Sequence, residues 1–396
     1  MAAHAELGRA PSRPPAWNNP AYRALFVQLV TVLLIAMLGW YVAANTIHNL
    51  QKQSIASGFG FLDRTAGFAI TTSLIEYTEK ATYGRAFLVG LLNTILISVL
   101  GIVCATALGF VVGVARLSRN WLVAKLAAAY VEIIRNTPLL LQIFFWYFAV
   151  LRALPPARQS LSAFDMIFLN IRGLYLPRPI VGPGFEAVPI TVLAAVVLTI
   201  VLRKWARKRF DATGRLFPAG WAGFGLIVGL PLLAFAAAGF PVSWSFPTLR
   251  GFNFSGGLVI IPEFVSVLLG LTIYTASYIA EIVRAGILAV SRGQTEAAGA
   301  LGLSRFQTLR LVVIPQAMRV IIPPLTSQYL NLTKNSSLGA AIAYPELVHV
   351  FMGTVLNQTG QAIETVGVGM LVYLTISLAI SFGMNVYNQK MALRER

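Results

Sequence analysis

The chain has 396 residues, of which 57% are hydrophobic and 11% charged, whereas an ordinary soluble domain has about 25% charged residues. This balance excludes a disordered chain and leaves too little polar surface to cover a soluble globule of this size. Four long stretches carry no charge: 24–51, 86–115, 216–249 and 365–389. Because a membrane-spanning helix needs about 20 apolar residues, the sequence predicts an all-α, polytopic integral membrane protein.

Several kinds of chemistry are absent from the sequence. The single cysteine, Cys104, excludes disulfides within the chain, and three scattered histidines suggest no metal site. No phosphate-binding loop is present, so we expect no catalytic residues and no bound cofactor. The net charge of +17 does not indicate nucleic acid, because the basic residues lie at the ends of apolar runs.

The apolar runs predict about eight spans. The first is preceded by a polar, proline-rich segment and exceeds the 7–15 residues of a signal-peptide core, so we interpret it as a retained helix. The third and seventh predicted spans contain charges, and the fourth is short. The eight runs are 24–47, 87–115, 126–151, 188–203, 217–240, 260–283, 321–343 and 365–388.

Lysine and arginine counts predict the orientation. With the N-terminus inside, 20 of the 31 basic residues lie in inner segments and nine in outer segments, while Arg135 and Lys334 lie within spans. Cytoplasmic loops carry an excess of these residues, so both termini are expected in the cytoplasm. The outer segments are 48–86, 152–187, 241–259 and 344–364.

Composition divides the chain into parts. Residues 152–187 are rich in proline and glycine and predict an ordered outer loop. Residues 188–240 contain two spans joined by the densest basic run, and predict an inserted helical hairpin. The predicted divisions are a cytoplasmic tail (1–23), the first helix with an outer segment (24–86), a transmembrane domain (87–388) that includes the inserted region 152–258 and the cytoplasmic loop 286–320, and a C-terminal cytoplasmic tail (389–396).

A stripe of small residues lies on the second span. Ala105, Gly109 and Gly113 follow one another at intervals of four residues, so they share one helix face. Such a stripe lets helices approach closely. It indicates either a subunit interface or helix packing within the chain.

The cytoplasmic loop carries the most informative pattern. Ser291–Gln294 and Ser304–Gln307 each have the spacing of a capping box, and Gly302 between them suits the left-handed position that ends a helix. The pattern predicts two short helices around a glycine turn. The second is expected to end near Ile314, before Pro315.

The order Glu296-Ala297-Ala298, three residues, Gly302, nine residues, Val312-Val313-Ile314-Pro315 resembles the EAA loop of ABC importer permeases. The resemblance implies a coupling helix that docks in a cleft of a separate ATPase subunit, which would bind ATP and Mg²⁺. The residues implied in this coupling are Glu296, Ala297, Ala298, Gly302, Arg305 and Pro315.

Further motifs extend the resemblance to the polar amino acid permease family, over roughly 87–151 and 260–388. They are Gly90-Leu91-Leu92-Asn93-Thr94, Arg116-Leu117-Ser118, Tyr130–Leu140, Tyr278–Arg284 and Lys334–Leu338. Asn136 stands where many relatives have glycine. The first outer segment, with Gly58–Leu62, and the 152–258 insertion resemble one subunit of the general L-amino-acid importers of Gram-negative bacteria.

This resemblance implies a type I ABC importer permease fold in the inner membrane. The implied partners are a second related permease, a pair of ATPase subunits, a periplasmic amino-acid-binding protein and membrane lipid. The resemblance leaves open the range of amino acids carried, whether the paired permease is identical, and which of the two holds the substrate pocket.

Charged residues within spans need a partner or a wet cavity. Glu132 and Arg135 are three residues apart and predict a structural pair, which braces a helix break at Pro138. Glu281 and Arg284 have the same spacing. Glu281 either pairs with Arg284 or receives the ammonium group of an amino acid substrate.

The most polar patch within any span surrounds Lys334 in the seventh. This patch either lines the substrate path or contacts a partner subunit. Its other members, taken with Glu281 and Arg284 as substrate-path candidates, are Asn331, Asn335, Ser336 and Ser337.

The motifs therefore predict a permease subunit of an ATP-driven importer of polar L-amino acids. An ion- or proton-coupled secondary transporter is the alternative, but it would require buried carboxylates on several helices, and only Glu132 and Glu281 qualify. A membrane-embedded enzyme would require a nucleophile and base or a metal set that the three histidines do not provide.

Overall fold

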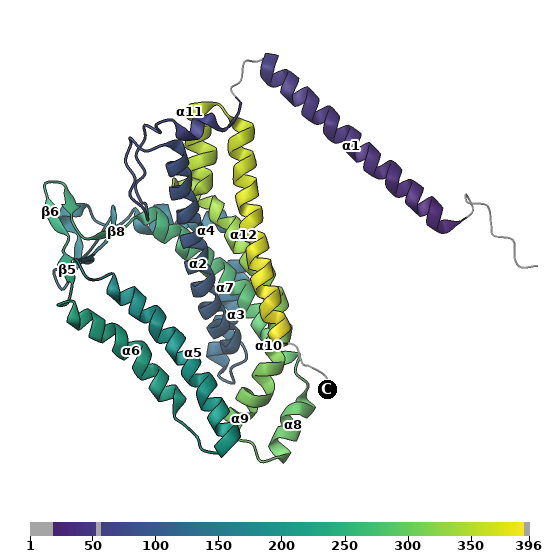
Figure 1. The fold of residues 1–396 in the computed structure, drawn as a ribbon, viewed down its shortest axis with the longest axis vertical. Coiled ribbons are helices and arrows are strands. Elements are labelled where there is room, and N and C mark those ends of the chain that lie inside the picture. The colour runs from purple at the N-terminus through teal and green to yellow at the C-terminus, as the bar shows by residue number, and fades with distance from the viewer. Residues whose placement is uncertain (1–18, 53–56, 392–396) are drawn as a thin grey trace, which may run out of the picture.

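A computed structural model describes residues 19–52 and 57–391. Within these residues, seven helices are long and apolar enough to cross a membrane, and a bent helix pair makes an eighth candidate. Figure 1 shows most of them side by side as a bundle. The predicted tails, 1–23 and 389–396, lie largely outside the described residues. The long helices are α1 (Pro20–Lys52), α2 (Tyr83–Ala115), α5 (Ala187–Thr213), α6 (Ala219–Ala237), α7 (Pro262–Leu288), α10 (Ile314–Asn335) and α12 (Ala362–Met391).

Helix α1 stands apart from the bundle (Figure 1). No residue in the most apolar stretch of α1 is buried. Its leucine, valine and tryptophan side chains, such as Trp40, are exposed. An apolar surface of this kind is stable in contact with lipid. A short 3₁₀ helix, η2 (Phe59–Asp63), then brings the chain to α2 and buries Phe61 against Tyr83 and Phe351.

Helices α2 and α7 pack closely along their lengths. A Cβ added at Gly109 would lie 2.6 Å from the Cβ of Ile279, and one added at Gly113 would lie 2.7 Å from the carbonyl oxygen of Ala280. Neither position has room for a methyl group, so glycine allows the two backbones to approach. The stripe of small residues therefore packs within the chain, and its interpretation as a subunit interface is wrong.

The third predicted span is broken. Helix α3 (Trp121–Arg135) is followed by a segment formed by α4 (Leu139–Phe144) and η3 (Phe145–Leu151). The chain bends by 105° between the two. The Nε2 of Gln142 donates to the carbonyl oxygens of Ile134 and Thr137, each at 3.0 Å, and so satisfies groups that the break frees. The break predicted at Pro138 is confirmed, and the bent pair remains a single candidate span in the region of the predicted one, 126–151.

The inserted region contains short strands that the sequence did not predict. Two of their pairings join the segment before the α5–α6 hairpin to the segment after it: Tyr175 lies opposite Val259, and Ile180 opposite Ser243. The predicted hairpin is present, but α5 continues to Thr213, so the basic run is helical. The strands form a four-stranded antiparallel sheet, β1 (Leu161–Ala163), β2 (Ile167–Asn170), β3 (Gly173–Leu176) and β8 (Leu258–Ile260), and two pairs, β4 (Arg178–Val181) with β5 (Val242–Ser245) and β6 (Thr248–Arg250) with β7 (Asn253–Ser255).

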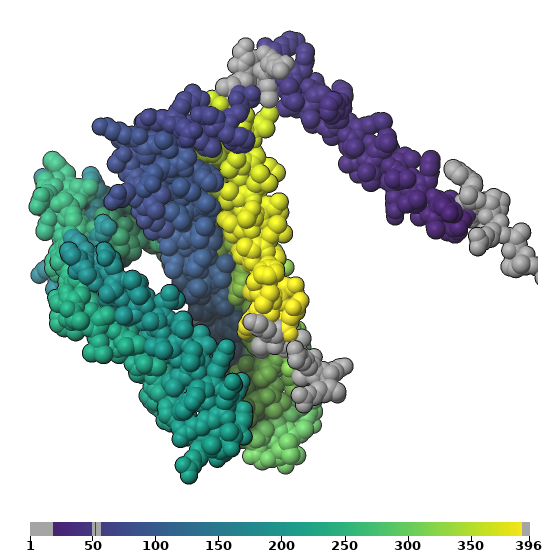
Figure 2. Space-filling model, in the orientation of Figure 1, coloured from purple at the N-terminus to yellow at the C-terminus, as the bar shows by residue number. Residues whose placement is uncertain are grey.

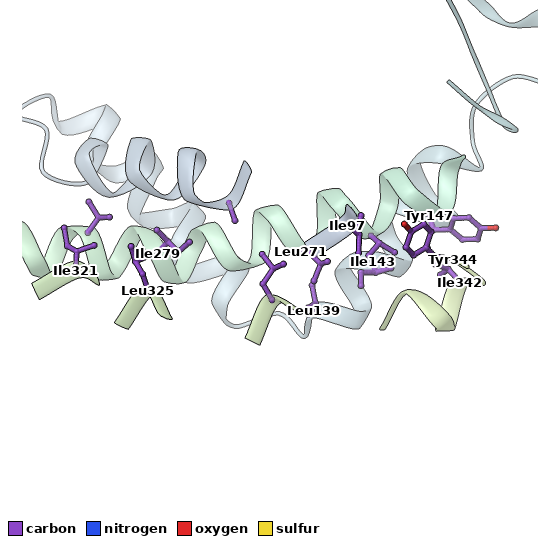
Figure 3. Packing of buried hydrophobic residues seen from close by; sticks show 14 of the residues in the cluster. Ile97, Leu139, Ile143, Tyr147, Leu271, Ile279, Ile321, Leu325, Ile342 and Tyr344 are labelled. Carbon is purple, nitrogen blue, oxygen red and sulfur yellow. The ribbon is translucent and has the colours of Figure 1, made fainter. Parts of the chain in front are cut away.

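The core of the bundle surrounds α7. Figure 3 shows Leu271 of α7 beside Leu139 of α4, and Ile279 near Ile321 and Leu325 of α10. Apolar side chains from the broken third span and from α10 thus meet on one central helix. This packing positions the C-terminal end of α7, from which the loop 286–320 departs.

The close approach of α2 and α7 generates a testable prediction. Gly109→Ala would place a methyl group within 2.6 Å of Ile279, and we expect overpacking to destabilise the protein by about 1–3 kcal/mol. The thermal unfolding midpoint of the purified protein measures this loss. Gly383→Ala is the matched control, because a Cβ there meets nothing within 4 Å. Equal midpoints for the two variants would contradict the required contact.

Candidate functional site: the cytoplasmic loop and the Lys334 pocket

The loop 286–320, which the sequence predicts to be cytoplasmic, forms a compact helical knuckle, defined as α8 (Arg292–Ala300) and α9 (Arg305–Thr308) with the turn between them. Gly302 has φ +76°. Its N–H donates to the carbonyl of Gly299, and the N–H of Leu303 donates to that of Ala298. These two bonds are the Schellman pattern that ends a helix at a left-handed residue. The predicted glycine turn is confirmed.

One of the two predicted capping boxes is formed. At the start of α9, Ser304 accepts from the N–H of Gln307, and the Gln307 side chain accepts from the N–H of Ser304. At the start of α8, Ser291 makes no side-chain cap. Gln294 instead accepts a hydrogen bond from Gln316 of α10, at 3.1 Å. The prediction of a capping box at Ser291 was therefore wrong, because the Gln294 side chain binds a residue distant in sequence and not the backbone of Ser291.

The knuckle presents apolar side chains on a polar surface. Leu301 is 81% exposed and Phe306 69% exposed, and Glu296 and Ala297 are exposed beside them, whereas Ala298 faces inward. Exposed apolar groups within a polar rim are typical of a protein interaction surface. The sequence analysis did not identify Leu301 or Phe306, although both flank the motif.

The helix after the knuckle does not end before Pro315. A π-helical turn, η5 (Leu309–Val313), joins α9 to α10, and Pro315 lies in the first turn of α10. Proline is tolerated there because the first turn of a helix leaves N–H groups unpaired. The predicted end near Ile314 was wrong, and one continuous helical segment runs from Arg305 to Ile342.

Glu281 lies between two arginines near the C-terminal end of α7. Its carboxylate forms an ion pair with Arg116, at the end of α2, and another with Arg284, whose Nη2 lies 2.6 Å from Oε1. The side chains of these three residues are partly buried, between 14% and 32% exposed. The Glu281–Arg284 pairing is present, and Arg116 joins it. The role of Glu281 in receiving a substrate ammonium group stays a prediction.

The predicted Glu132–Arg135 pair is not formed in the described chain. The guanidinium carbon of Arg135 instead lies 4.9 Å from the ring centroid of Tyr278 on α7. A cation over an aromatic face is a favourable alternative partner, which explains why the spacing alone gave the wrong contact. Arg135 thereby links α3, just before the break, to α7.

The polar patch around Lys334 is divided by the structure. Lys334 and Ser337 line a pocket of about 430 Å³, whereas Ser336 is buried and its hydroxyl donates to the carbonyl of Thr333. Asn331 is exposed and Asn335 partly buried, outside the pocket lining. The remaining lining residues are Val348, Met352, Met370, Tyr373, Leu374 and Ser377.

A buried turn next to this pocket was missed by the sequence analysis. Asn93 of α2 donates to the carbonyl of Pro345 at 2.8 Å, and the Thr94 hydroxyl accepts from the N–H of Leu347 at 3.0 Å. The fully buried carboxylate of Glu346 accepts from the N–H groups of Val348 and His349. These bonds give the Asn93-Thr94 motif a structural role that its sequence alone did not reveal.

Glu346 also connects this turn to the pocket. Its Oε2 accepts a hydrogen bond from the hydroxyl of Tyr373 at 3.1 Å, and Tyr373 is one of the lining residues. The pocket wall is therefore held by the same buried carboxylate that accepts hydrogen bonds from the first two N–H groups of the π-helix η7 (Val348–Val355).

Comparison with known proteins identifies the family. The model for the inner membrane component of binding-protein-dependent transport systems matches residues 98–393, which is well over half of the chain. The chain belongs to this family of permeases. The family resemblance predicted from the motifs, the membrane location and the permease fold are thereby confirmed.

Individual relatives extend the match over the whole permease. The chain is 56% identical over 379 residues to the putative amino-acid ABC transporter permease protein YhdX of Escherichia coli (strain K12), and the match covers 96% of each chain. It is 51% identical over 399 residues to the general L-amino acid transport system permease protein AapQ of Rhizobium johnstonii, covering 99% and 100%. Among solved structures, a chain from the crystal structure of an amino acid ABC transporter with histidines aligns at a TM-score of 0.46 and 19% identity, covering 78% of the permease and 95% of that chain.

The ion cluster predicts coupling between the ends of α2 and α7. Arg116→Gln and Glu281→Gln should each lower the thermal stability of the permease. The double variant should lose less stability than the sum of the two single losses, because each single change already breaks the same ion pair. The expected coupling energy is about 1–3 kcal/mol. Strictly additive losses would show that the two residues act independently. Arg119→Gln, near the same helix end and exposed, serves as the control.

Proposed function

We propose that this permease is a subunit of an ATP-driven importer that carries polar L-amino acids across the inner membrane. The substrate class is supported by the names of the two relatives, which match nearly the whole chain. The permease itself would have no catalytic residue and no cofactor, and ATP with Mg²⁺ would bind to a separate subunit. An ion-coupled secondary transporter remains the alternative that experiment must exclude.

The exposed knuckle is the observation that carries this proposal. An ATPase cleft would receive the apolar side chains of Leu301 and Phe306 at its centre, with Glu296 and Arg305 at the polar rim, as in interfaces with an apolar core. Ala297 is small and exposed and allows close approach of the docked surface, whereas Ala298 packs inward. The Gln294–Gln316 bond attaches α8 to the start of α10, and so links the docked surface to a transmembrane helix.

The Lys334 pocket is proposed as part of the substrate path. Lys334 offers an ammonium group to a substrate carboxylate, and Ser337, Tyr373 and Ser377 add hydroxyl groups to an otherwise apolar lining. Charged groups within the membrane characteristically mark such paths. The exposed side chains of Met370 and Leu374 on the rim would contact a second, related permease, and a periplasmic binding protein would deliver the amino acid.

The orientation with both termini in the cytoplasm is also part of the proposal. It places the knuckle and the Arg116–Glu281–Arg284 cluster on the cytoplasmic side, where ATP is available. The strands of the inserted region then lie on the periplasmic side. The excess of basic residues in the inner segments supports this orientation.

Transport by the reconstituted complex tests the function. Proteoliposomes that contain the permease, its paired permease and the ATPase should accumulate labelled glutamate only with ATP and binding protein present, and a panel of unlabelled L-amino acids should compete. Uptake driven by an ion gradient without ATP would instead establish the secondary transporter. Competition by one amino acid alone would contradict broad specificity.

The Gly302 turn predicts a separation of stability from coupling. Gly302→Val strains a left-handed backbone position by roughly 1–2 kcal/mol, although a Cβ there meets no atom within 4 Å. We expect normal abundance, and uptake and ATPase stimulation reduced about tenfold. Gly302→Asn, which tolerates this conformation, is the matched control and should retain most uptake. Full uptake in Gly302→Val would refute the coupling role.

A further inference from the structure

The α5–α6 hairpin carries a strong positive charge that the proposed transport mechanism does not use. Six cations lie between residues 203 and 215, and Asp211 is the single acidic residue between the hairpin's first residue and Phe252. Arg203, Lys204, Arg207 and Lys208 are all exposed. Within the described chain, no carboxylate forms an ion pair with any of these four.

The four exposed cations share one side of α5. At 100° per residue, Arg203, Arg207, Lys204 and Lys208 occupy an arc of about 140°. The buried Ala206 points away from this arc. We call the four residues the basic arc. Its side chains therefore project away from the contact between α5 and α6.

The length of α5 places the basic arc at the level of the lipid headgroups. The uncharged part of the helix, 187–202, spans about 24 Å at 1.5 Å per residue, while the hydrocarbon core is about 30 Å thick. Long basic side chains at such a boundary extend toward the headgroups. Trp205 stacks edge-on against Phe217 at 5.4 Å, and tryptophan is enriched at this interface.

The hairpin depends on lipid for its position. Helices α5 and α6 pack mainly on each other. Only 11% of the residues in the most apolar stretch of α5, and 6% of those in that of α6, are buried. Figure 2 shows an opening between the hairpin and the bundle on the viewed face. In a bilayer, acyl chains would fill this space, and their headgroups would lie next to the cytoplasmic end of α5.

We propose that the basic arc binds anionic phospholipid headgroups and holds the hairpin at the cytoplasmic surface of the membrane. The phosphate groups would supply the negative charge that the chain lacks there. Clusters of four to eight basic residues at the cytoplasmic end of a membrane helix attract anionic lipid in this way. The proposal requires the cytoplasmic orientation of this end, but not the identity of the substrate.

Lipid retention by the intact complex tests the proposal. The full-length permease, co-expressed with its transporter subunits, is reconstituted in nanodiscs of equimolar phosphatidylglycerol and phosphatidylcholine, then extracted and analysed by native mass spectrometry. The native complex should retain phosphatidylglycerol preferentially. Replacing all four arc residues with glutamine should reduce that preference by about tenfold or more.

Two controls separate charge from structure. Arg203→Lys with Arg207→Lys keeps the charge and should keep the preference. Arg172→Gln with Arg250→Gln removes exposed cations from the strand-bearing outer region and should leave it unchanged. If the fourfold glutamine variant fails to insert, salt titration of the native complex replaces it, because headgroup attraction should weaken as ionic strength rises.

Three results would overturn the proposal. The first is equal retention of the two lipids by the native complex, and the second is an unchanged preference in the fourfold variant or at high salt. The third is loss of the ATPase subunit from the fourfold variant while phosphatidylglycerol retention stays unchanged. That third result would assign the basic arc to a protein interface.

Discussion

The contact between α2 and α7 is the constraint on which the rest of the bundle depends. Gly109 and Gly113 remove the side chains that would separate the two backbones. The same approach brings Arg116, at the C-terminal end of α2, to Glu281 of α7, so helix packing and the ion cluster belong to one interface. Since α7 also packs against α3, α4 and α10, a shift of α2 would displace the helix that these three elements share as a packing partner.

A second constraint is that polar groups inside the bundle need partners from the chain. Gln142 satisfies carbonyl groups at the break in the third span, and Asn93 and Thr94 bind the backbone of the buried turn. Glu346 accepts two backbone N–H groups and the hydroxyl of Tyr373. Irregular backbone at such a depth is tolerated because it is enclosed by protein. The Lys334 pocket can therefore have a defined wall beside a non-helical segment.

The features predictable from the sequence were those that depend on a few neighbouring residues. The apolar runs, the break at Pro138 and the turn at Gly302 belong to this class. Contacts between distant residues were not predictable, because spacing along a helix says nothing about a competing partner on another helix. Arg135 lies over the ring of Tyr278, and the side chain of Gln294 accepts a hydrogen bond from Gln316. The strands were missed because each is only three or four residues long, and two of their pairings, β3 with β8 and β4 with β5, join segments on opposite sides of the inserted hairpin.

The continuous helical segment from Arg305 to Ile342 connects the two halves of the proposed mechanism. Its N-terminal end belongs to the knuckle, and its C-terminal part carries Lys334 and Ser337 on the pocket wall. Within each half of the segment, a helix transmits a tilt along its length without requiring a chain of separate contacts. Pro323 and Pro324 within α10 each remove a backbone donor and so concentrate bending in the middle of this segment. Movement of the docked knuckle would therefore change the angle between the two halves of the segment, and the pocket wall would move with the second half.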